Sequence, residues 1–173
     1  AGLYFINSET LDTIHYSHNV NDSKSISENV ILSLFKDIKN NIWAGTFAGL
    51  NKFNRNDQSF SHYSKNLNDT NSLSNNYIYT ILQKSDNTLY LGTAGGLNIF
   101  NFETNSFTVV KGNGIQNDVI NSMLHVNNEL WIGTNNGISK LDLNNSSVKN
   151  FTRDDGLQGL ISNPDAITLT NNG

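Results

Sequence analysis

The sequence predicts an all-β fold, a β-propeller of four-stranded blades that is present as a partial segment of about three to four blades. One ten-residue motif, found at 41–50, 88–97 and 129–138, reads apolar–aromatic–apolar–Gly-Thr, two further residues, Gly and an apolar residue. Its first glycines lie 47 and then 41 residues apart. A period of about 40–50 residues with four short strands per repeat is typical of propeller blades. Helical repeats of similar period would need apolar residues at helical spacing, which these segments lack.

The repeat places each strand in turn. Residues 2–7 match the third strand of a blade and 10–17 its outer strand. Three full cycles follow, with strands predicted at 30–35, 42–46, 49–54 and 59–63, then 77–83, 89–93, 96–101 and 106–110, then 119–126, 130–134, 137–142 and 148–152. A last strand is predicted at 166–169, leading into a hairpin at 171–173.

The first strand of each cycle is nearly continuously apolar, which is expected when both faces of a sheet are covered by neighbouring blades. A small hydroxyl residue recurs in its middle, at Ser33, Thr80 and Ser122, and we interpret it as allowing close approach between blades. The Asn-rich segment 39–41 suits a tight hairpin, because Asn tolerates positive φ.

The blade boundaries follow from the same alignment: the end of a blade at 1–27, blades at 28–74, 75–116 and 117–158, and the start of the next at 159–173. A propeller typically closes with about 4–8 blades, so we expect this chain to be a piece of a longer protein. Open blade faces and unpaired edges favour a homodimer or other self-association.

Composition excludes some functions. The net charge of −4 argues against binding to a nucleic-acid backbone, which requires a basic surface. The chain has no cysteine, and its longest apolar run, at 30–32, is far too short to span a bilayer. His15 and His18 have a spacing seen in metal sites, but residues three apart on a strand point to opposite faces. We therefore predict no metal and no cofactor.

Four motifs carry a family resemblance: 130–138, 89–98, 72–76 and 151–157. They resemble two-component regulator propeller repeats, which fill the periplasmic sensor region of hybrid two-component systems (histidine kinase/response regulator) in Bacteroidetes. The resemblance implies two seven-bladed propellers, an immunoglobulin-like domain, a membrane span and cytoplasmic kinase modules. It further implies an inner-membrane protein that acts as a dimer and senses oligosaccharides. This segment itself would then be no enzyme.

The candidate ligand-binding residues lie on one rim of the propeller. Arg153 and Asp155 fall in the loop from an outer strand to the next blade, and Phe47, Asn135 and Asn136 fall in turns after second strands. Arg could pair with a sugar acid or sulfate, and the Asn amides could hydrogen-bond to hydroxyls.

Other interpretations stay open. Residues 154–156 also suit a simple turn, since Asp and Gly favour turns. The chain could be a structural or protein–protein interaction propeller. A propeller lyase or hydrolase is a weaker alternative, because a glycosidase needs two carboxylates across a cleft and the sequence places no such pair.

Overall fold

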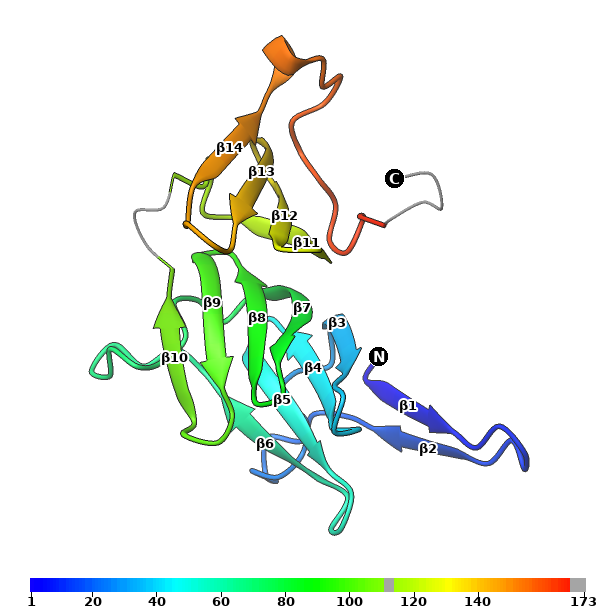
Figure 1. Cartoon of the computed structure of the whole chain (residues 1–173). Helices are drawn as coiled ribbons and strands as arrows, with labels where there is room; N and C mark the ends of the chain where they lie inside the picture. The colour runs from blue at the N-terminus through cyan, green and yellow to red at the C-terminus, as the bar shows by residue number, and fades with distance from the viewer. Residues whose placement is uncertain (111–113, 169–173) are drawn as a thin grey trace.

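The structure, a computed structural model that describes residues 1–110 and 114–168, is all-β as predicted. The described strands form one two-stranded sheet and three four-stranded antiparallel sheets, and a single turn of 3-10 helix spans Arg153–Asp155 (Figure 1). Each four-stranded sheet is one propeller blade. The partial propeller expected from the repeat is therefore confirmed.

The strands follow one another around each blade in chain order. The two-stranded sheet contains β1 (Leu3–Ile6) and β2 (Thr13–Tyr16). Blade 1 contains β3 (Ile31–Lys36), β4 (Ile42–Thr46), β5 (Gly49–Asn54) and β6 (Ser59–Tyr63). Blade 2 contains β7 (Ile78–Ser85), β8 (Thr88–Thr93), β9 (Gly96–Asn101) and β10 (Ser106–Val109). Blade 3 contains β11 (Ile120–Val126), β12 (Glu129–Thr134), β13 (Gly137–Asp142) and β14 (Val148–Phe151).

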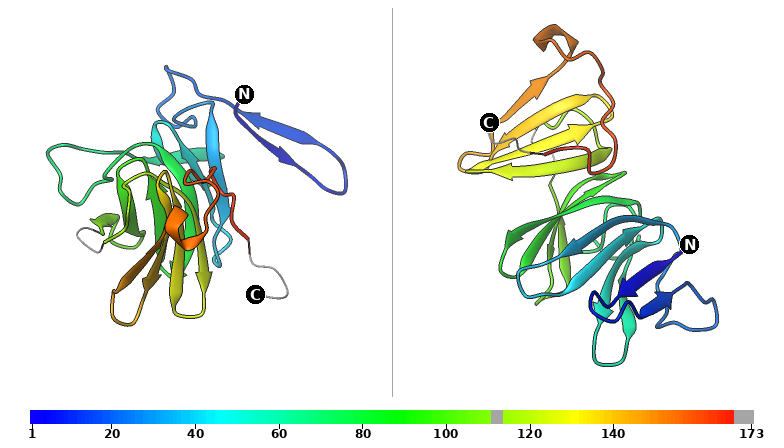
Figure 2. Two further views of the ribbon diagram at one scale, coloured as in Figure 1. Left: turned by 90° about the horizontal axis from the view of Figure 1, so that it is seen from above. Right: turned by 90° about the vertical axis from the view of Figure 1, so that its right-hand side faces the viewer.

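The inner strands β3, β7 and β11 contact one another in sequence, so the blades stack around a common inner edge (Figure 2). Each inner strand shifts register by one residue near its start, at Ile31/Ser33, Ile78/Thr80 and Ile120/Ser122. Such β-bulges bend a strand and increase its twist. Their repetition shows that the sequence repeat is also a repeat of backbone geometry.

Close approach between blades explains the Gly of each Gly-Thr pair. A Cβ built on Gly92 would lie 2.5 Å from Thr80 Cγ2 on the neighbouring strand and 2.7 Å from Ile120 Cγ2 of the next blade. Ile120 is fully buried in that position. Of the small hydroxyl residues predicted at the contact between blades, Ser33 lies there, because its Oγ donates to Ile78 O of the next blade (3.2 Å).

The Thr of the same pair builds the turn that follows. Thr93 Oγ1 accepts a hydrogen bond from Gly95 N (3.0 Å) and donates to Gly96 O (2.9 Å). Thr46 and Thr134 make the same two bonds in blades 1 and 3. These hydroxyls satisfy turn groups that are otherwise buried without water.

Buried Asn side chains tie each blade to the loop that enters it. Asn98, which is fully buried, accepts from Ser74 N (3.0 Å) and donates to Ser74 Oγ (2.7 Å). Asn51 makes the same pair of bonds with Ser27. The third repeat replaces this device with a weaker one, in which Ser139 Oγ accepts from Gln116 N.

Two predicted strands need correction. The outer strand predicted at 10–17 begins only at Thr13, because Leu11 adopts a positive φ of 61° in a turn capped by Asn7. The strand predicted at 166–169 is not formed over residues 166–168. Asp165 there has a φ of 52° and its carbonyl accepts from Ile167 N, which bends the chain. Leu169 and the hairpin predicted at 171–173 lie outside the described residues.

Candidate functional site

The turns 46–49, 93–96 and 134–137 form what we call the rim, together with the loops that enter β7 and β11. Ala94 N donates to Tyr77 O (3.2 Å) and Gly96 N donates to Asp118 O (2.7 Å), so each turn is joined to the loop of its own or the next blade. The rim is thus a set of loops held by rigid strands, which is the usual location of binding residues.

An aromatic pair is the most exposed apolar feature of the rim. Phe47 follows β4, Tyr77 precedes β7, and their ring centroids lie 4.9 Å apart at an interplanar angle of 72°. Phe47 is 40% exposed and Tyr77 is 45% exposed. Sequence reasoning selected Phe47 but missed Tyr77. The signal was available, because the two equivalent positions hold Val30 and Val119.

The predicted site residues Asn135 and Asn136 have different roles in the structure. Asn135 Oδ1 accepts from the Nδ2 of buried Asn121 (2.7 Å), and Asn121 Nδ2 also donates to Ser162 O (2.7 Å). Asn136 uses its backbone N–H to donate to Thr134 Oγ1 (3.0 Å). Asn135 itself is exposed, so its amide nitrogen faces solvent while its oxygen is engaged.

The other two predicted site residues lie in the 3-10 turn. Asp155 Oδ2 accepts from Thr152 N (2.9 Å), and Thr152 Oγ1 accepts from Asp154 N (3.3 Å), which completes a capping box. Gly156 ends the turn with a φ of 95°. Turn formation therefore accounts for the Asp155 carboxylate. The exposed Arg153 side chain makes no hydrogen bond or ion pair with any described residue.

The structure thus brings the candidates together only in part. Phe47 lies beside Tyr77, and Asn135 lies beside Asn121. Among residues 1–110 and 114–168, no hydrogen bond, ion pair or ring contact joins the turn at Arg153–Asp155 to either pair. Ligand binding by these residues stays a prediction.

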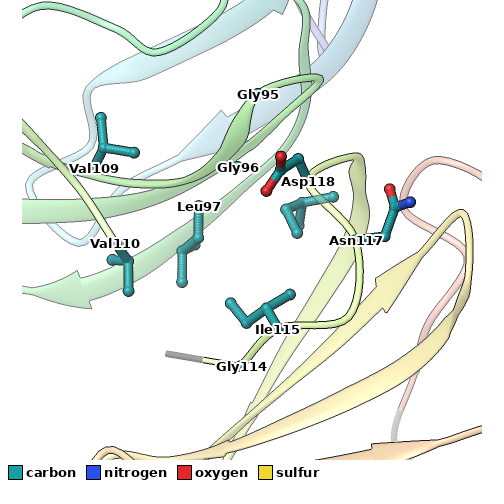
Figure 3. Close-up of a pocket in the computed structure, with 10 residues that line it drawn as sticks. Gly95, Gly96, Leu97, Val109, Val110, Gly114, Ile115, Asn117 and Asp118 are labelled. Atoms are coloured by element: carbon teal, nitrogen blue, oxygen red, sulfur yellow. The ribbon is translucent and has the colours of Figure 1, made fainter. Parts of the chain in front are cut away.

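A cavity of about 340 Å³ extends from the rim between blades 2 and 3 (Figure 3). Leu97, Val110 and Ile115 supply apolar walls, and Asn117 and Asp118 lie beside the turn of blade 2. Asn117 Oδ1 accepts from Val119 N (2.8 Å), which fixes the loop that enters β11. Among the described residues that line the cavity, Asp118 is the one charged residue.

Three of the four histidines, His15, His18 and His62, make hydrogen bonds with backbone carbonyls. His15 Nε2 lies 2.8 Å from Ala1 O, and His62 Nε2 lies 2.7 Å from Ser25 O. These repeat-equivalent residues tie an outer strand to an adjoining segment. Within the described residues, no group of three or more His, Cys, Asp or Glu side chains could hold a metal ion. The same part of the chain contains no helix with the length and apolar character needed to cross a membrane.

Comparison with known proteins identifies the repeats. Residues 25–48 and 72–95 match the two-component regulator propeller family model. The structure is similar to the extracellular domain assigned to a hybrid two-component system, BT3049, of B. thetaiotaomicron, with a TM-score of 0.74 and 27% identity. That match covers 82% of this chain but only 21% of the other, so the chain spans about a fifth of its length.

Structures of a second extracellular domain from B. thetaiotaomicron, BT4673, share the fold. They have TM-scores of 0.61 and 0.55, each with 20% identity, and they match 99% and 94% of this chain and 31% and 30% of their own. No curated protein is similar in sequence. The resemblance expected from the motifs is confirmed: the chain carries two-component regulator propeller repeats, folded as consecutive blades of a β-propeller.

Proposed function

We propose that this chain is an extracytoplasmic, ligand-sensing propeller segment of a hybrid two-component sensor, that its ligands are oligosaccharides, and that it relays binding to a histidine kinase outside this segment. The observation that carries the proposal is the occurrence of two regulator-propeller segments within a fold similar to the extracellular domain of such a system. By the same analogy the segment lies in the periplasm, as part of the sensor region of an inner-membrane protein.

Rim chemistry supports a sugar ligand. Two half-exposed aromatic rings, Phe47 and Tyr77, offer apolar faces on which the C–H face of a sugar ring could stack. The free amide nitrogen of Asn135 and the guanidinium of Arg153 supply donors for hydroxyl, carboxylate or sulfate groups. Apolar platforms and a few polar donors are the two components of a small-molecule site, and the rim carries them on different blades.

Signalling would work by population shift. A ligand that binds one placement of the propellers better than another moves the equilibrium by its difference in affinity and no more. The rim suits this role because its turns come from successive blades and are joined across them by hydrogen bonds, for example Gly96 N to Asp118 O.

The test is calorimetric titration of the complete sensor region with a panel of neutral, uronic and sulfated oligosaccharides. Removing one stacking ring, by Phe47→Ala or Tyr77→Ala, should cost about 0.5–1.5 kcal/mol of binding, or roughly a two- to tenfold weaker affinity. Ile38→Ala is the matched control, since Ile38 is 62% exposed in the hairpin between β3 and β4, at the opposite end of the blade from the turn 46–49. Unchanged affinity in both ring variants would refute the rim site, and no binding across the panel would refute the ligand class.

A protein-contact role has its own observation. The two-stranded sheet exposes several large apolar side chains: Tyr4 (54%), Ile6 (64%), Leu11 (73%) and Ile14 (46%). Tyr4 and Ile6 lie on one face of this sheet, whereas Ile14, which pairs with Phe5, lies on the other and Leu11 lies in the connecting turn. Exposed apolar side chains that gather in this way are normally covered by another sheet or another chain. We therefore propose self-association through this sheet, to be measured by sedimentation velocity. Ile6→Ser should shift the species distribution toward monomer, and an identical distribution would exclude this surface.

A further inference from the structure

The interface between blades 1 and 2, which we call the first seam, is filled with aromatic rings. The buried Trp43 ring lies 5.6 Å from those of Phe100 and Phe102. Phe100 also stacks on Phe107 at 4.3 Å and lies 4.7 Å from Tyr63. Such aromatic contacts bury large areas and leave little free space.

The second seam lies between blades 2 and 3. Of the five aromatic positions of the first seam, it keeps a ring at one, where Tyr90 replaces Trp43. Strand pairing aligns Leu130 with Leu141 as it aligns Leu89 with Phe100, so the two seams can be compared position by position. The residues that replace Trp43, Phe100, Phe102, Phe107 and Tyr63 are Tyr90, Leu141, Leu143, Val148 and Val110.

A bridge that closes the outer end of the first seam is also absent from the second. Lys39 Nζ lies 5.6 Å from the Phe102 ring and donates to Asn87 Oδ1, and Ile38 N donates to Gln83 Oε1 (3.2 Å). The equivalent of Lys39 in blade 2 is Asp86, whose side chain is shorter and has the opposite charge, and the acceptor Gln83 is replaced by His125 in blade 3. Among the described residues, no hydrogen bond or ion pair joins the hairpin 84–88 to blade 3.

A cavity of about 480 Å³ results, within the range of about 300–1,000 Å³ typical of small-molecule sites. Its apolar walls include Tyr90, Ile99, Leu141 and Leu143. Lys84 lies on the blade 2 side of its mouth, with Nζ 5.8 Å from the Tyr90 ring centroid and no ion pair to a described residue. The cavity therefore combines an apolar wall with polar groups, which are His125, Asn128, Asp142 and Ser146 on the blade 3 side and Lys84 on the blade 2 side.

We propose that the second seam binds a small aromatic carboxylate, with its ring in the space that the Phe102 ring occupies in the first seam and its carboxylate at Lys84. The ring is favoured because aromatic side chains fill the equivalent volume where the fold is closed. The acid is favoured because Lys84 lacks a counterion. This site is separate from the rim and does not depend on the sugar-binding proposal.

The anionic group opposite Lys84 does not block this arrangement. Asp142 belongs to the blade 3 wall, and its carboxylate accepts from Asn144 N (2.8 Å) and from Asn145 Nδ2 (3.2 Å). It is engaged in its own turn. Asp142→Asn should nevertheless tighten acid binding a few-fold, because it removes a nearby negative charge.

The experiment is titration of the ¹⁵N-labelled chain with phenylacetate, followed by NMR. Saturable shifts are expected at the backbone amides of the cavity walls. Leu143→Phe, which restores the ring of the first seam, should weaken binding at least tenfold without loss of folding. Lys84→Gln should weaken phenylacetate about three- to tenfold but leave benzyl alcohol unchanged. Lys52→Gln is the matched control, because Lys52 holds the same kind of position over Trp43, with Nζ 5.4 Å from its ring.

Several results would overturn the proposal. They are the absence of saturable shifts, shifts that persist unchanged in Leu143→Phe, and equal weakening by Lys84→Gln and Lys52→Gln. If phenylacetate fails to bind but the amide of N-acetylphenylalanine binds and is blocked by Leu143→Phe, the occupant is a partner's aromatic side chain and the small-acid proposal is wrong. A melting temperature equal to that of the parent chain establishes that each variant is folded.

Discussion

The buried Asp37 carboxylate organises the hairpin of blade 1, and we predict that Asp37→Asn destabilises the chain strongly. Asp37 accepts four hydrogen bonds: from Lys39 N (2.9 Å), Asn41 N (2.8 Å), Asn41 Nδ2 (2.8 Å) and Trp43 Nε1 (2.9 Å). It is only 2% exposed. The last of these bonds ties the hairpin to the ring at the centre of the first seam.

The size of the stability loss depends on which of the four hydrogen bonds an Asn side chain can still accept. Asn keeps one acceptor oxygen for the two backbone donors but turns an NH2 group toward Trp43 Nε1 and Asn41 Nδ2, which are themselves donors. Hydrogen bonds to a charged group contribute about 1.5–3 kcal/mol each, so losing two predicts about 2–4 kcal/mol after the exposed side of the hairpin relaxes into water. Asp86→Asn is the control, since Asp86 is an exposed carboxylate in the corresponding hairpin of blade 2, and it should change stability by less than about 0.5 kcal/mol.

The assay is urea unfolding followed by circular dichroism, because the chain has a second tryptophan, Trp131, and a double-mutant cycle must remove Trp43. A double-mutant cycle with Trp43→Phe should give a coupling energy of about 1–2 kcal/mol, because both changes remove the same bond. If Asp37→Asn stays within about 0.5 kcal/mol of the parent chain, or if the cycle is additive, this account of the hairpin is wrong.

The same carboxylate predicts an acid dependence. Burial raises the pKa of Asp37, but the hydrogen bonds from Trp43, Asn41 and Lys39 outweigh it and hold the pKa below its usual value. A lowered folded-state pKa means that the stabilisation is fully present above the unfolded pKa of about 3.9 and is lost as the pH falls through the folded value. The difference between the parent chain and Asp37→Asn should therefore be constant from pH 5 to 7 and shrink below about pH 4.

Two further substitutions test how the blades are held. Gly92→Ala puts a Cβ 2.7 Å from Ile120 Cγ2 and should lower the free energy of unfolding by about 1–3 kcal/mol through overpacking. Gly159→Ala is the control and should be neutral, because its Cβ meets nothing within 4 Å. Equal unfolding midpoints for the two variants would contradict the close-approach argument. Asn98→Ala removes both hydrogen bonds to Ser74 at a fully buried position and should lower the free energy of unfolding in urea by about 2–4 kcal/mol. A loss under about 0.5 kcal/mol would mean that other contacts hold the loop that enters the blade.

The strands and turns could be predicted because their causes are local. A Gly-Thr pair followed two residues later by Gly specifies the turn wherever it occurs, since the two turn bonds of Thr93 Oγ1 join residues only two and three positions away, Gly95 and Gly96. The hairpin at Asn40 is likewise a local matter, and its φ of 62° is the conformation expected of Asn. Spacing alone then set the order of strands within each blade.

The corrections concern contacts between distant segments. The end of the chain follows the start of β11 through Asp165 N, which donates to Asn121 O, and through Ser162 N, which donates to Thr134 O. No short sequence pattern in residues 159–168 predicts those two hydrogen bonds. Tyr77 stands out in the sequence, because Val30 and Val119 hold the equivalent positions, but its contact with Phe47 does not: that contact joins two blades, and the repeat within one blade does not show which side chains meet across a seam.

The positions at which one blade differs from the next predict features that the repeat pattern alone does not. The replacement of Phe102 by Leu143 is visible in the sequence, and by itself it changes a side chain by a few atoms. It leaves a cavity only because the blades keep their spacing, which the contact at Gly92 fixes, and because no residue at Asp86 repeats the reach of Lys39. The strands around both seams pair in the same register, so the backbone does not close around the smaller side chains of the second seam. The volume that the aromatic rings fill in the first seam therefore stays open for another group.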